Sequence, residues 1–491
     1  MLFNTLDFLV FFFIILCLIS QFKFRKFQHL LIIFSSIFFL YYTDSYLVTL
    51  LIFTILLHFY VGKAIYNSQT VIRKKIFLLI GVIGSVGILG IFKYADFAIL
   101  QINAFGMVID LNSEIPLLNL ALPIGISFYT FQSMSYIIDI YRGSLKPSKT
   151  LKEYAFFVAF FLPLVAGPIL RASNFLPQLR EKINQQETTQ KLKLFVINNQ
   201  NLKFGITLMA LGFFKKMFIA DNIGPLVNDI FSNPIGMESF SIIIGTIAFG
   251  IQLYCDFSGY SDIAIGGAAI LGFKIPLNFN KPFFATSPSD FWTRWHISLS
   301  TWVRDYLYYP LVFKNRKSNS IVFISLLISM ILMGIWHGAS WNFLIWGGIH
   351  GLFLACYTLL RKKYPNASSN KFFKSKFGKI SSILVTQYLI FFTFIAFWMR
   401  DFEHMIYAMK KYVFLDFAFE KTIDIMSANE FPILIIILFV ILHIFSYKKG
   451  NIPERISKLK IHYWIGILFM FFLPVAIFYL GSAREFIYFQ F

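Results

Sequence analysis

Long apolar runs constrain this chain more than any other feature, since each run must be kept away from water. Leu6–Ser20, Leu47–Tyr60, Ile76–Phe92 and Trp464–Leu480 approach or reach the roughly 17–25 residues that a helix needs to cross about 30 Å of hydrocarbon. Of 491 residues, 57% are hydrophobic and only 14% charged, whereas soluble chains have about a quarter charged residues. The sequence therefore predicts an all-α polytopic membrane protein, with residues 1–491 forming one integral-membrane domain.

The formal net charge of +20 does not indicate nucleic-acid binding. Most Lys and Arg residues lie in short loops beside the apolar runs, where retention on the cytoplasmic side of a membrane places them. The first run lacks the basic start and small-residue cleavage site of a signal peptide, so we expect a retained helix. Cys17, Cys255 and Cys356 show no CxxC spacing, so neither a disulfide framework nor a zinc site is predicted.

The basic clusters also predict the topology. Residues 23–26 and 73–75 should both face the cytoplasm, which requires a hairpin between them, turning near residues 43–45, and an external N-terminus. Residues 155–170 have basic residues on both sides and contain Pro163 and Pro168, which favours a re-entrant hairpin over a crossing. Gln178–Lys203 is then expected as a cytoplasmic surface helix and loop.

Further spans follow along the rest of the chain. They are expected near residues 204–221, 240–272, 320–360 (two crossings), 381–399, 432–447 and 464–481. The total is about 11–12 transmembrane helices, with re-entrant and interfacial helices besides, and an external C-terminus. Span 204–221 is the least secure of these because it contains Lys215 and Lys216.

Polar residues inside spans are costly and mark functional candidates, and they are densest within residues 251–350. Asp256 and Asp262 lie six residues apart in one span, not on one helical face. One carboxylate could face a functional interior. Alternatively, the stretch could serve helix packing through Ser258, Gly259 and Ser261.

Residues 287–306 are predicted to form one amphipathic helix at an interface or funnel wall. Ser287 before Pro288, with Asp290 three residues after the serine, is a good helix start. An apolar stripe and a polar row follow helical spacing; they comprise Phe291, Trp295, Leu299, Trp302 and Tyr306, and Arg294, Ser298, Thr301 and Asp305. His296 lies off both rows, and it either reaches a central cavity or is purely structural.

His337 is the strongest catalytic candidate. It lies in Trp336-His337-Gly338, in the middle of the segment expected to cross twice. In such an apolar environment the neutral form of imidazole is favoured, and neutral imidazole can act as a general base. The alternative is a histidine bonded to a neighbouring helix. Gly334 and Gly338 should permit close backbone approach. His350 is a weaker candidate, and no HExxH or HxxxH spacing predicts a catalytic metal.

Arg294-Trp-His296 followed by Trp336-His337-Gly338 resembles the membrane-bound O-acyltransferase family. The stretches 256–262, 291–308 and 334–341 are similar to the branch that acetylates alginate, peptidoglycan or other exported polysaccharides. The resemblance implies a ring-like helical fold around a central channel, with His337 as the catalytic residue and His296 near it. Residues 240–360 would be the catalytic core.

Residues 486–491 also resemble the aromatic C-terminal motif of this branch, and residues 482–491 are predicted to form an external tail. A related motif ends a partner protein of teichoic-acid D-alanylation, where the tyrosine is proposed to carry the acyl group. The resemblance therefore implies that Tyr488 is an acyl carrier. A terminal aromatic tail can equally be an interfacial anchor.

The working hypothesis is an O-acetyltransferase of the bacterial cytoplasmic membrane. Acetyl-CoA would present its thioester at the inner mouth, where basic residues of the 281–317 region meet its phosphates. His337, His296 and Tyr488 would carry the reaction; Arg294, Arg304, Trp336 and Asn342 are the predicted substrate-binding residues, and cofactor-binding residues stay unassigned. The acetyl group would pass to a periplasmic or extracellular acetyltransferase subunit and its polysaccharide acceptor. The alternatives are a teichoic-acid-type D-alanyl transferase and a transporter of a lipid-linked saccharide.

Overall fold

The computed structural model describes residues 2–21, 25–42, 48–109, 114–121, 123, 125–165, 167–188, 199–313, 315–367, 370–479, 481 and 484–487. Within these residues all regular structure is helical, with no strand. Seven of the described helices are long and apolar enough to cross a membrane. The predicted all-α polytopic membrane protein is therefore confirmed. The total of 11–12 crossings, their sidedness and the central channel stay predictions.

The chain divides into two compact units, the first comprising Met1–Ile206 and Ile263–Pro276. Its helices are α1 (Leu6–Gln21), α2 (Arg25–Tyr41), α3 (Val48–Asn67), α4 (Val71–Val108), α5 (Ile126–Tyr141), α6 (Leu151–Ala159), α7 (Phe161–Leu164) and α8 (Ala172–Thr188). Two further helices, α9 (Asn199–Phe213) and α11 (Ser239–Ile270), contribute residues to both units. The single domain predicted over residues 1–491 stays a prediction.

The second unit comprises Thr207–Asp262 and Leu277–Phe491. Its other helices are the π-helix η1 (Phe214–Ala220), α10 (Asp221–Phe231), the 3-10 helix η2 (Pro282–Phe284), α12 (Pro288–Trp292), α13 (Ile297–Val303), the π-helix η3 (Arg304–Tyr308), α14 (Tyr309–Val312), α15 (Asn319–His337), α16 (Trp341–Lys363), α17 (Lys371–Lys374), α18 (Lys376–Trp398), α19 (Phe402–Val413), α20 (Glu420–Ala428), α21 (Glu430–Lys449), α22 (Ile452–Ser457) and α23 (Ile461–Ile477). Every sequence-predicted site residue that the structure describes belongs to this unit.

In the first unit, the apolar segment 155–170 breaks at Phe160, before the two prolines, and the predicted re-entrant hairpin stays a prediction. Helix α6 ends at Ala159, Phe160 has φ −56° and ψ 109°, and α7 covers only four residues. Neither helix is long enough to cross a membrane. The rings of Phe156, Phe160 and Phe161 are fully buried, so the segment is part of the packed interior of this unit.

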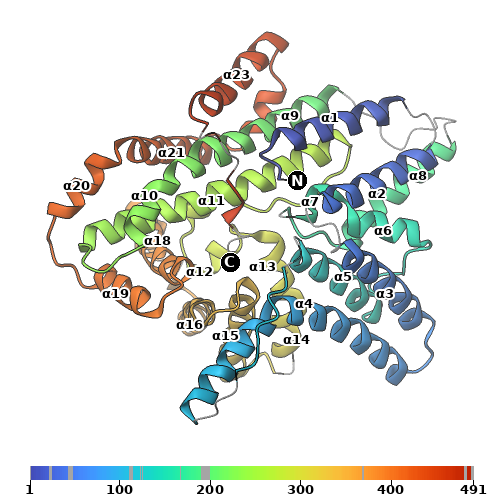
Figure 1. Cartoon of the computed structure of the whole chain (residues 1–491), viewed down its shortest axis with the longest axis horizontal. Coiled ribbons are helices and arrows are strands. Elements are labelled where there is room, and N and C mark those ends of the chain that lie inside the picture. Colours follow the sequence, from blue (N-terminus) through green and yellow to red (C-terminus); the bar gives the residue numbers. More distant parts are fainter. Residues whose placement is uncertain are drawn as a thin grey trace. The chain divides into compact units, whose positions relative to one another are not determined.

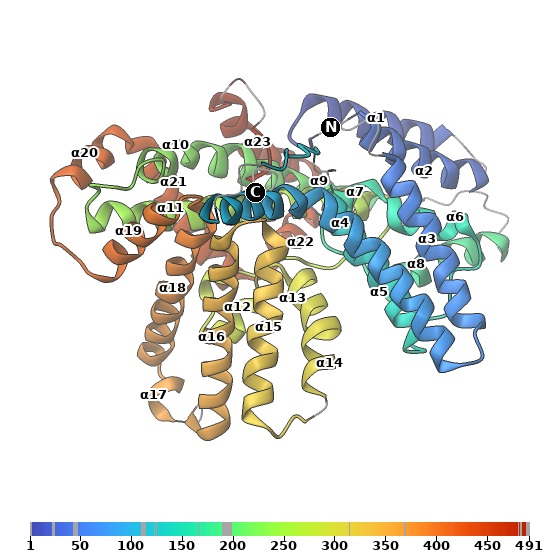
Figure 2. The ribbon, with the colours of Figure 1, turned by 60° about the horizontal axis from the view of Figure 1, so that its bottom comes forward.

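The segment 319–363 folds into a close helical hairpin of two helices, each long and apolar enough to cross a membrane. Helices α15 and α16 run side by side, with α18 next to α16 (Figure 2). A Cβ atom on Gly334 would lie 2.2 Å from the carbonyl oxygen of Phe343, and one on Gly347 would lie 2.4 Å from that of Met330. Glycine is therefore required at this crossing. The predicted close backbone approach is confirmed at Gly334, whereas at Gly338 the close neighbour is the side chain of Phe343.

Residues 287–306 do not form the single amphipathic helix that their spacing predicted. Ser287 accepts a hydrogen bond from the Asp290 N–H, as a helix cap does, but α12 ends at Trp292 and α13 begins at Ile297. His296 between them has φ 42° and ψ 54°, a left-handed conformation that breaks the helix. The apolar stripe is buried throughout nonetheless. The periodicity therefore predicted correctly which side chains are buried, but it did not predict the break in the helix.

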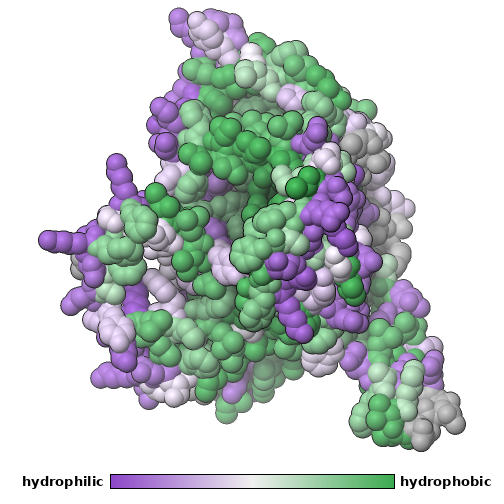
Figure 3. All heavy atoms as spheres, turned by 90° about the vertical axis from the view of Figure 1, so that its left-hand side faces the viewer, coloured by the Kyte–Doolittle hydropathy of each residue, from purple (hydrophilic) through white to green (hydrophobic). Residues whose placement is uncertain are grey.

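Helix α21 has an apolar surface that is exposed in the structure. Leu434, Ile437, Ile441 and Phe445 are each at least half exposed. On the face shown in Figure 3, hydrophobic atoms cover much of the surface, while hydrophilic atoms lie along the left-hand side and in a patch right of the centre. Such exposure is unfavourable in water but suits a hydrocarbon solvent.

Candidate active site

His337 is the last residue of α15, at the tight turn into α16. The backbone of Gly338 is extended, and Ser340 then caps α16 by accepting a hydrogen bond from the Asn342 N–H. The His337 side chain is buried. Its ring centroid lies 4.9 Å from those of Trp336 and Trp346, and 5.2 Å from that of Phe397. An aromatic cage from α15, α16 and α18 therefore holds the imidazole.

His296 lies in a different, hydrogen-bonded environment. Its Nδ1 atom is 3.1 Å from Oδ1 of Asn278. The same oxygen accepts hydrogen bonds from the backbone N–H of Ser298 (3.3 Å) and from the Ser298 hydroxyl (2.8 Å). Nδ2 of Asn278 donates to the hydroxyl of Ser261 on α11. Asn278 thus fixes the short segment that carries His296.

These bonds determine the tautomer of His296. A backbone N–H can only donate, so the Asn278 atom that faces Ser298 must be the acceptor oxygen. Nδ1 of His296 must then carry the proton, and Nε2 is the acceptor of the ring. Burial lowers the pKa of His296, which lies outside the seven candidate spans, to about 3. Its imidazole is therefore neutral at ordinary pH.

Trp336 connects the two histidines. Its ring centroid lies 6.4 Å from that of His296 and 4.9 Å from that of His337. All three residues are buried. The structure thus brings together three predicted site residues that are up to 41 positions apart in sequence.

His350 extends the cluster along α16. Its ring lies 4.6 Å from Trp346 and 5.1 Å from Trp292. The hydroxyl of Thr393 donates to the carbonyl of Ile390, so it must accept from Nε2 of His350 at 2.9 Å. The weak sequence signal at His350 therefore corresponds to a histidine held between α16 and α18.

A cavity of about 320 Å³ adjoins these aromatic residues. It lies between the α12–η3 segment and the α15–α16 hairpin, and both Trp292 and Met333 line it. Arg304 lies on its wall, with its side chain half exposed and its Nε 2.8 Å from Asp305. The volume suits a small acyl group with part of its carrier.

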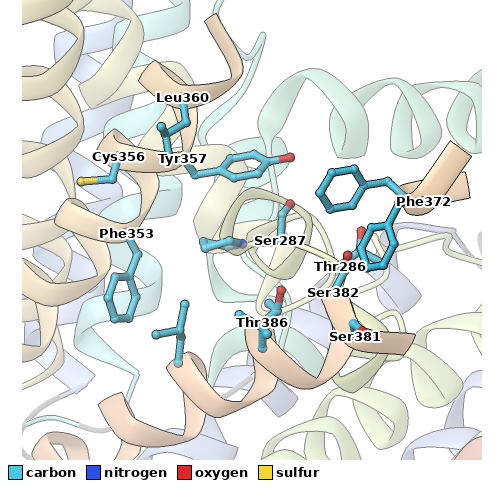
Figure 4. A pocket seen from close by; sticks show the side chains of 14 residues that line it. Thr286, Ser287, Phe353, Cys356, Tyr357, Leu360, Phe372, Ser381, Ser382 and Thr386 are labelled. Carbon is cyan, nitrogen blue, oxygen red and sulfur yellow. The ribbon is translucent and has the colours of Figure 1, made fainter. Parts of the chain in front are cut away.

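A second cavity, of about 440 Å³, lies between α16, α17, α18 and the start of α12. Phe353, Tyr357 and Phe372 make its lining largely apolar (Figure 4). It shares no lining residue with the first cavity and contains none of the predicted site residues. The first cavity is therefore the better candidate for an acyl donor.

The remaining predicted residues have structural partners or lie elsewhere. Arg294 forms an ion pair with Asp290 at 2.7 Å; although burial opposes it, hydrogen bonds from Thr286 and Arg294 lower the pKa of Asp290. Asn342 donates to the carbonyl of Met399 and so ties α16 to the end of α18. Tyr488 lies outside the described residues.

Lys215 and Lys216, which made span 204–221 insecure, are explained by the two intramembrane carboxylates. Lys215 pairs with Asp262 at 2.6 Å and Lys216 with Asp256 at 2.5 Å. Adjacent lysines on the π-helix η1 thus reach carboxylates on different faces of α11. The packing interpretation is also confirmed, since a Cβ atom on Gly259 would lie 2.7 Å from the carbonyl of Gly212.

Comparison with known proteins identifies the family. The model of the membrane-bound O-acyltransferase family matches residues 141–396, more than half of the chain. The chain belongs to this family of acyltransferase enzymes. The matched segment contains His296, Trp336 and His337.

Individual relatives support the same assignment. The peptidoglycan O-acetyltransferase of Helicobacter pylori is 32% identical over 414 residues, 79% of this chain and 74% of that protein. The protein of Azotobacter vinelandii named "Probable alginate O-acetylase AlgI" is 41% identical over 303 residues, 61% of this chain and 56% of that protein. The teichoic acid D-alanyltransferase of Bacillus subtilis is 32% identical over 301 residues, 58% of this chain and 71% of that protein. The chain spans about half the length of the alginate O-acetylases that it matches.

Proposed function

We propose that this protein is an O-acetyltransferase of the cytoplasmic membrane that moves acetyl groups from cytoplasmic acetyl-CoA to an exported or cell-wall polysaccharide. One observation carries the proposal. Two buried histidines, His296 and His337, both contact Trp336. Met333, three residues before Trp336 on α15, lines a cavity that Arg304 also lines. The choice of acetyl as the acyl group, and of a polysaccharide as the acceptor, is based on the names of the alginate and peptidoglycan relatives.

In the proposed reaction, a hydroxyl group attacks the carbonyl carbon of the acetyl thioester. His337 takes the hydroxyl proton as general base, the carbon–sulfur bond breaks, and the coenzyme A thiolate leaves and takes up a proton. In the tautomer that Asn278 imposes, Nε2 of His296 is a hydrogen-bond acceptor, so His296 orients an N–H group of the acyl donor, while the single proton of the attacking hydroxyl goes to His337. That tautomer makes His296 unsuited to donate to an oxyanion.

The attacking hydroxyl is that of Tyr488, which then hands the acetyl group to an external acetyltransferase subunit and its polysaccharide. Arg294 and Arg304 meet the phosphates of the donor, while Trp336 and Asn342 shape the site. The assignment of Tyr488 rests on the aromatic C-terminal motif in residues 486–491. Family membership argues against the alternative of a saccharide transporter.

A second candidate is D-alanyl transfer, because 71% of the Bacillus subtilis teichoic acid D-alanyltransferase is covered by the match. The two functions would share His337 and differ in the donor. The D-alanyl enzyme would take its acyl group from a carrier protein instead of coenzyme A.

The donor and the carrier residue can be tested together. Purified protein in nanodiscs is incubated with acetyl-CoA labelled in the acetyl group, and the labelled residue is mapped by mass spectrometry. We expect the label on Tyr488 and its absence from the Tyr488→Phe variant. Acetyl label elsewhere would leave Tyr488 an anchor. Labelling only by a D-alanyl carrier-protein thioester, with none by acetyl-CoA, would favour the second candidate.

A further inference from the structure

The second unit contains a buried cluster of charges that the histidine chemistry does not use. The Lys216 ammonium lies 2.5 Å from Oδ1 of Asp256 and 2.8 Å from Oδ1 of Asp221. The side chains of Lys216 and Asp256 are 1% and 0% exposed. Burying such a pair adds little stability by itself, since desolvation offsets much of the attraction. Its presence is better explained by what the charges bind.

The cluster binds the backbone of the C-terminal segment. The N–H of Ile487 donates to Oδ2 of Asp256 at 2.9 Å, and the carbonyl of Glu485 accepts from Lys216 at 3.2 Å. Between these two residues, the fully buried ring of Phe486 packs on Phe257 and Tyr260, at centroid distances of 5.2 and 4.7 Å. Figure 1 shows this segment, in red, returning to α11. Both anchoring bonds are charge-assisted and thus stronger than neutral ones.

The anchored segment lies next to the candidate active site. The Phe257 ring that contacts Phe486 also contacts His296, at 4.6 Å between centroids. One aromatic ring therefore separates the docked segment from His296. Tyr488 follows Ile487 directly in the sequence.

We infer that Lys216, Asp256 and Asp221 form a socket for the C-terminal segment, and that its occupation fixes the chain register from which Tyr488 is presented to the histidines. These three are positioning residues. The register is fixed because the socket binds one backbone N–H and one carbonyl, two residues apart. The catalytic consequence rests on the proposed function, whereas the docking itself does not.

The neighbouring ion pair provides a matched control. Lys215 and Asp262 lie on the same two helices and form a bond of similar length, 2.6 Å. The hydrogen bonds to Glu485 and Ile487, however, are made by Lys216 and Asp256. The double variant Lys216→Met/Asp256→Asn, called the socket variant, removes the ion pair of the socket. The double variant Lys215→Met/Asp262→Asn, called the control variant, removes the neighbouring ion pair and leaves the socket intact.

Docking is measured by hydrogen exchange of the C-terminal peptide in the full-length protein in nanodiscs. We expect amides within residues 484–487 to exchange at least tenfold faster in the socket variant and at the normal rate in the control variant. Equal exchange in both variants would overturn the socket while leaving the proposed function standing. If the double variant does not fold, Asp256→Asn is compared with Asp262→Asn in the same way.

The catalytic consequence is measured by acetyl transfer from labelled acetyl-CoA. The socket variant should lose at least tenfold in kcat with KM for the donor within twofold, and Lys216→Arg, which keeps the charge, should recover part of the loss. Faster exchange with unchanged kcat would show that the tail docks but is not presented for reaction, which would overturn the inference. Unlabelled wild-type protein would refute the proposed function, and the exchange result would still stand.

Discussion

His296 and His337 both contact Trp336, but their surroundings differ in kind. Hydrogen bonds to Asn278 fix the tautomer and orientation of His296. Aromatic rings from three helices enclose His337, with Trp346 and Phe397 edge-on to its imidazole. The difference suggests a division of labour. We assign orientation to His296, whose Nδ1 is held by Asn278, and proton transfer to His337, which aromatic rings enclose.

The largest effect should come from His337→Ala. Removing a general base costs about 10²–10⁴ in rate, so acetyl transfer should fall by roughly that factor while the amount of protein in the membrane is unchanged. His443→Ala provides the control. This buried histidine lies on α21, where it packs against Phe439 of the same helix and Phe284 of η2. A comparable loss of rate in both variants would indicate a general packing defect and break the proposed distinction.

Asn278→Asp should change how transfer depends on pH. In the wild type the pKa of His296 is lowered to about 3, so the imidazole is neutral above that pH and adds no titration between pH 5 and 8. A carboxylate beside Nδ1 favours the imidazolium and raises this pKa. The variant should then lose activity as the pH falls through the raised pKa, because Nε2 becomes protonated. A pH–rate profile of the same shape as the wild type would refute the orienting role.

Gly334→Ala should disturb the His337 side of the comparison through the backbone. The new Cβ would meet the Phe343 carbonyl at 2.2 Å, so α15 and α16 must separate, at a cost of about 1–3 kcal/mol in the free energy of unfolding. Gly348→Ala in α16 is the matched control, since nothing lies within 4 Å of its Cβ. Thermal unfolding in detergent measures both, and equal midpoints would contradict the close crossing.

The smallest effect should come from Trp336→Phe, which keeps an aromatic ring beside both histidines. We expect less than a tenfold loss in kcat. Trp336→Ala should in addition destabilise the protein by about 3–5 kcal/mol because it leaves a cavity. Steady-state kinetics on the two variants would show whether the indole N–H matters. A loss with Phe as large as with Ala would give Trp336 a direct role in the reaction.

Much of the fold could be predicted because bilayer physics acts locally. The apolar segment 319–363, with Ser318 and Ser340 accepting bonds at two helix starts, behaves as its sequence predicts. The break at His296 could not be predicted, because the left-handed conformation of a histidine leaves no periodic signal. It depends on Asn278, whose bonds to Ser261 and Ser298 are 17 and 20 residues distant in sequence.

The site was predicted only in part, because short motifs can be recognised in the sequence but contacts between distant segments cannot. His337 and Trp336 were found from one short motif, but Asn278, Trp292 and Trp346 were missed because each acts through contacts between segments. Lys215 and Lys216 argued against a buried helix until their partners Asp262 and Asp256 were known. Sequence spacing showed that these carboxylates face different ways. It could not show that two adjacent lysines, on a π-helical turn, reach both.

The central claim, that His337 is the base for acyl transfer from a thioester, is tested most directly by a single-turnover measurement. Wild-type and His337→Gln proteins in nanodiscs are mixed with excess acetyl-CoA, and release of the coenzyme A thiol is followed together with acetyl-CoA binding. We predict at least a hundredfold slower thiol release in His337→Gln, with donor affinity within twofold of the wild type. Thiol release at the wild-type rate in His337→Gln would contradict the account.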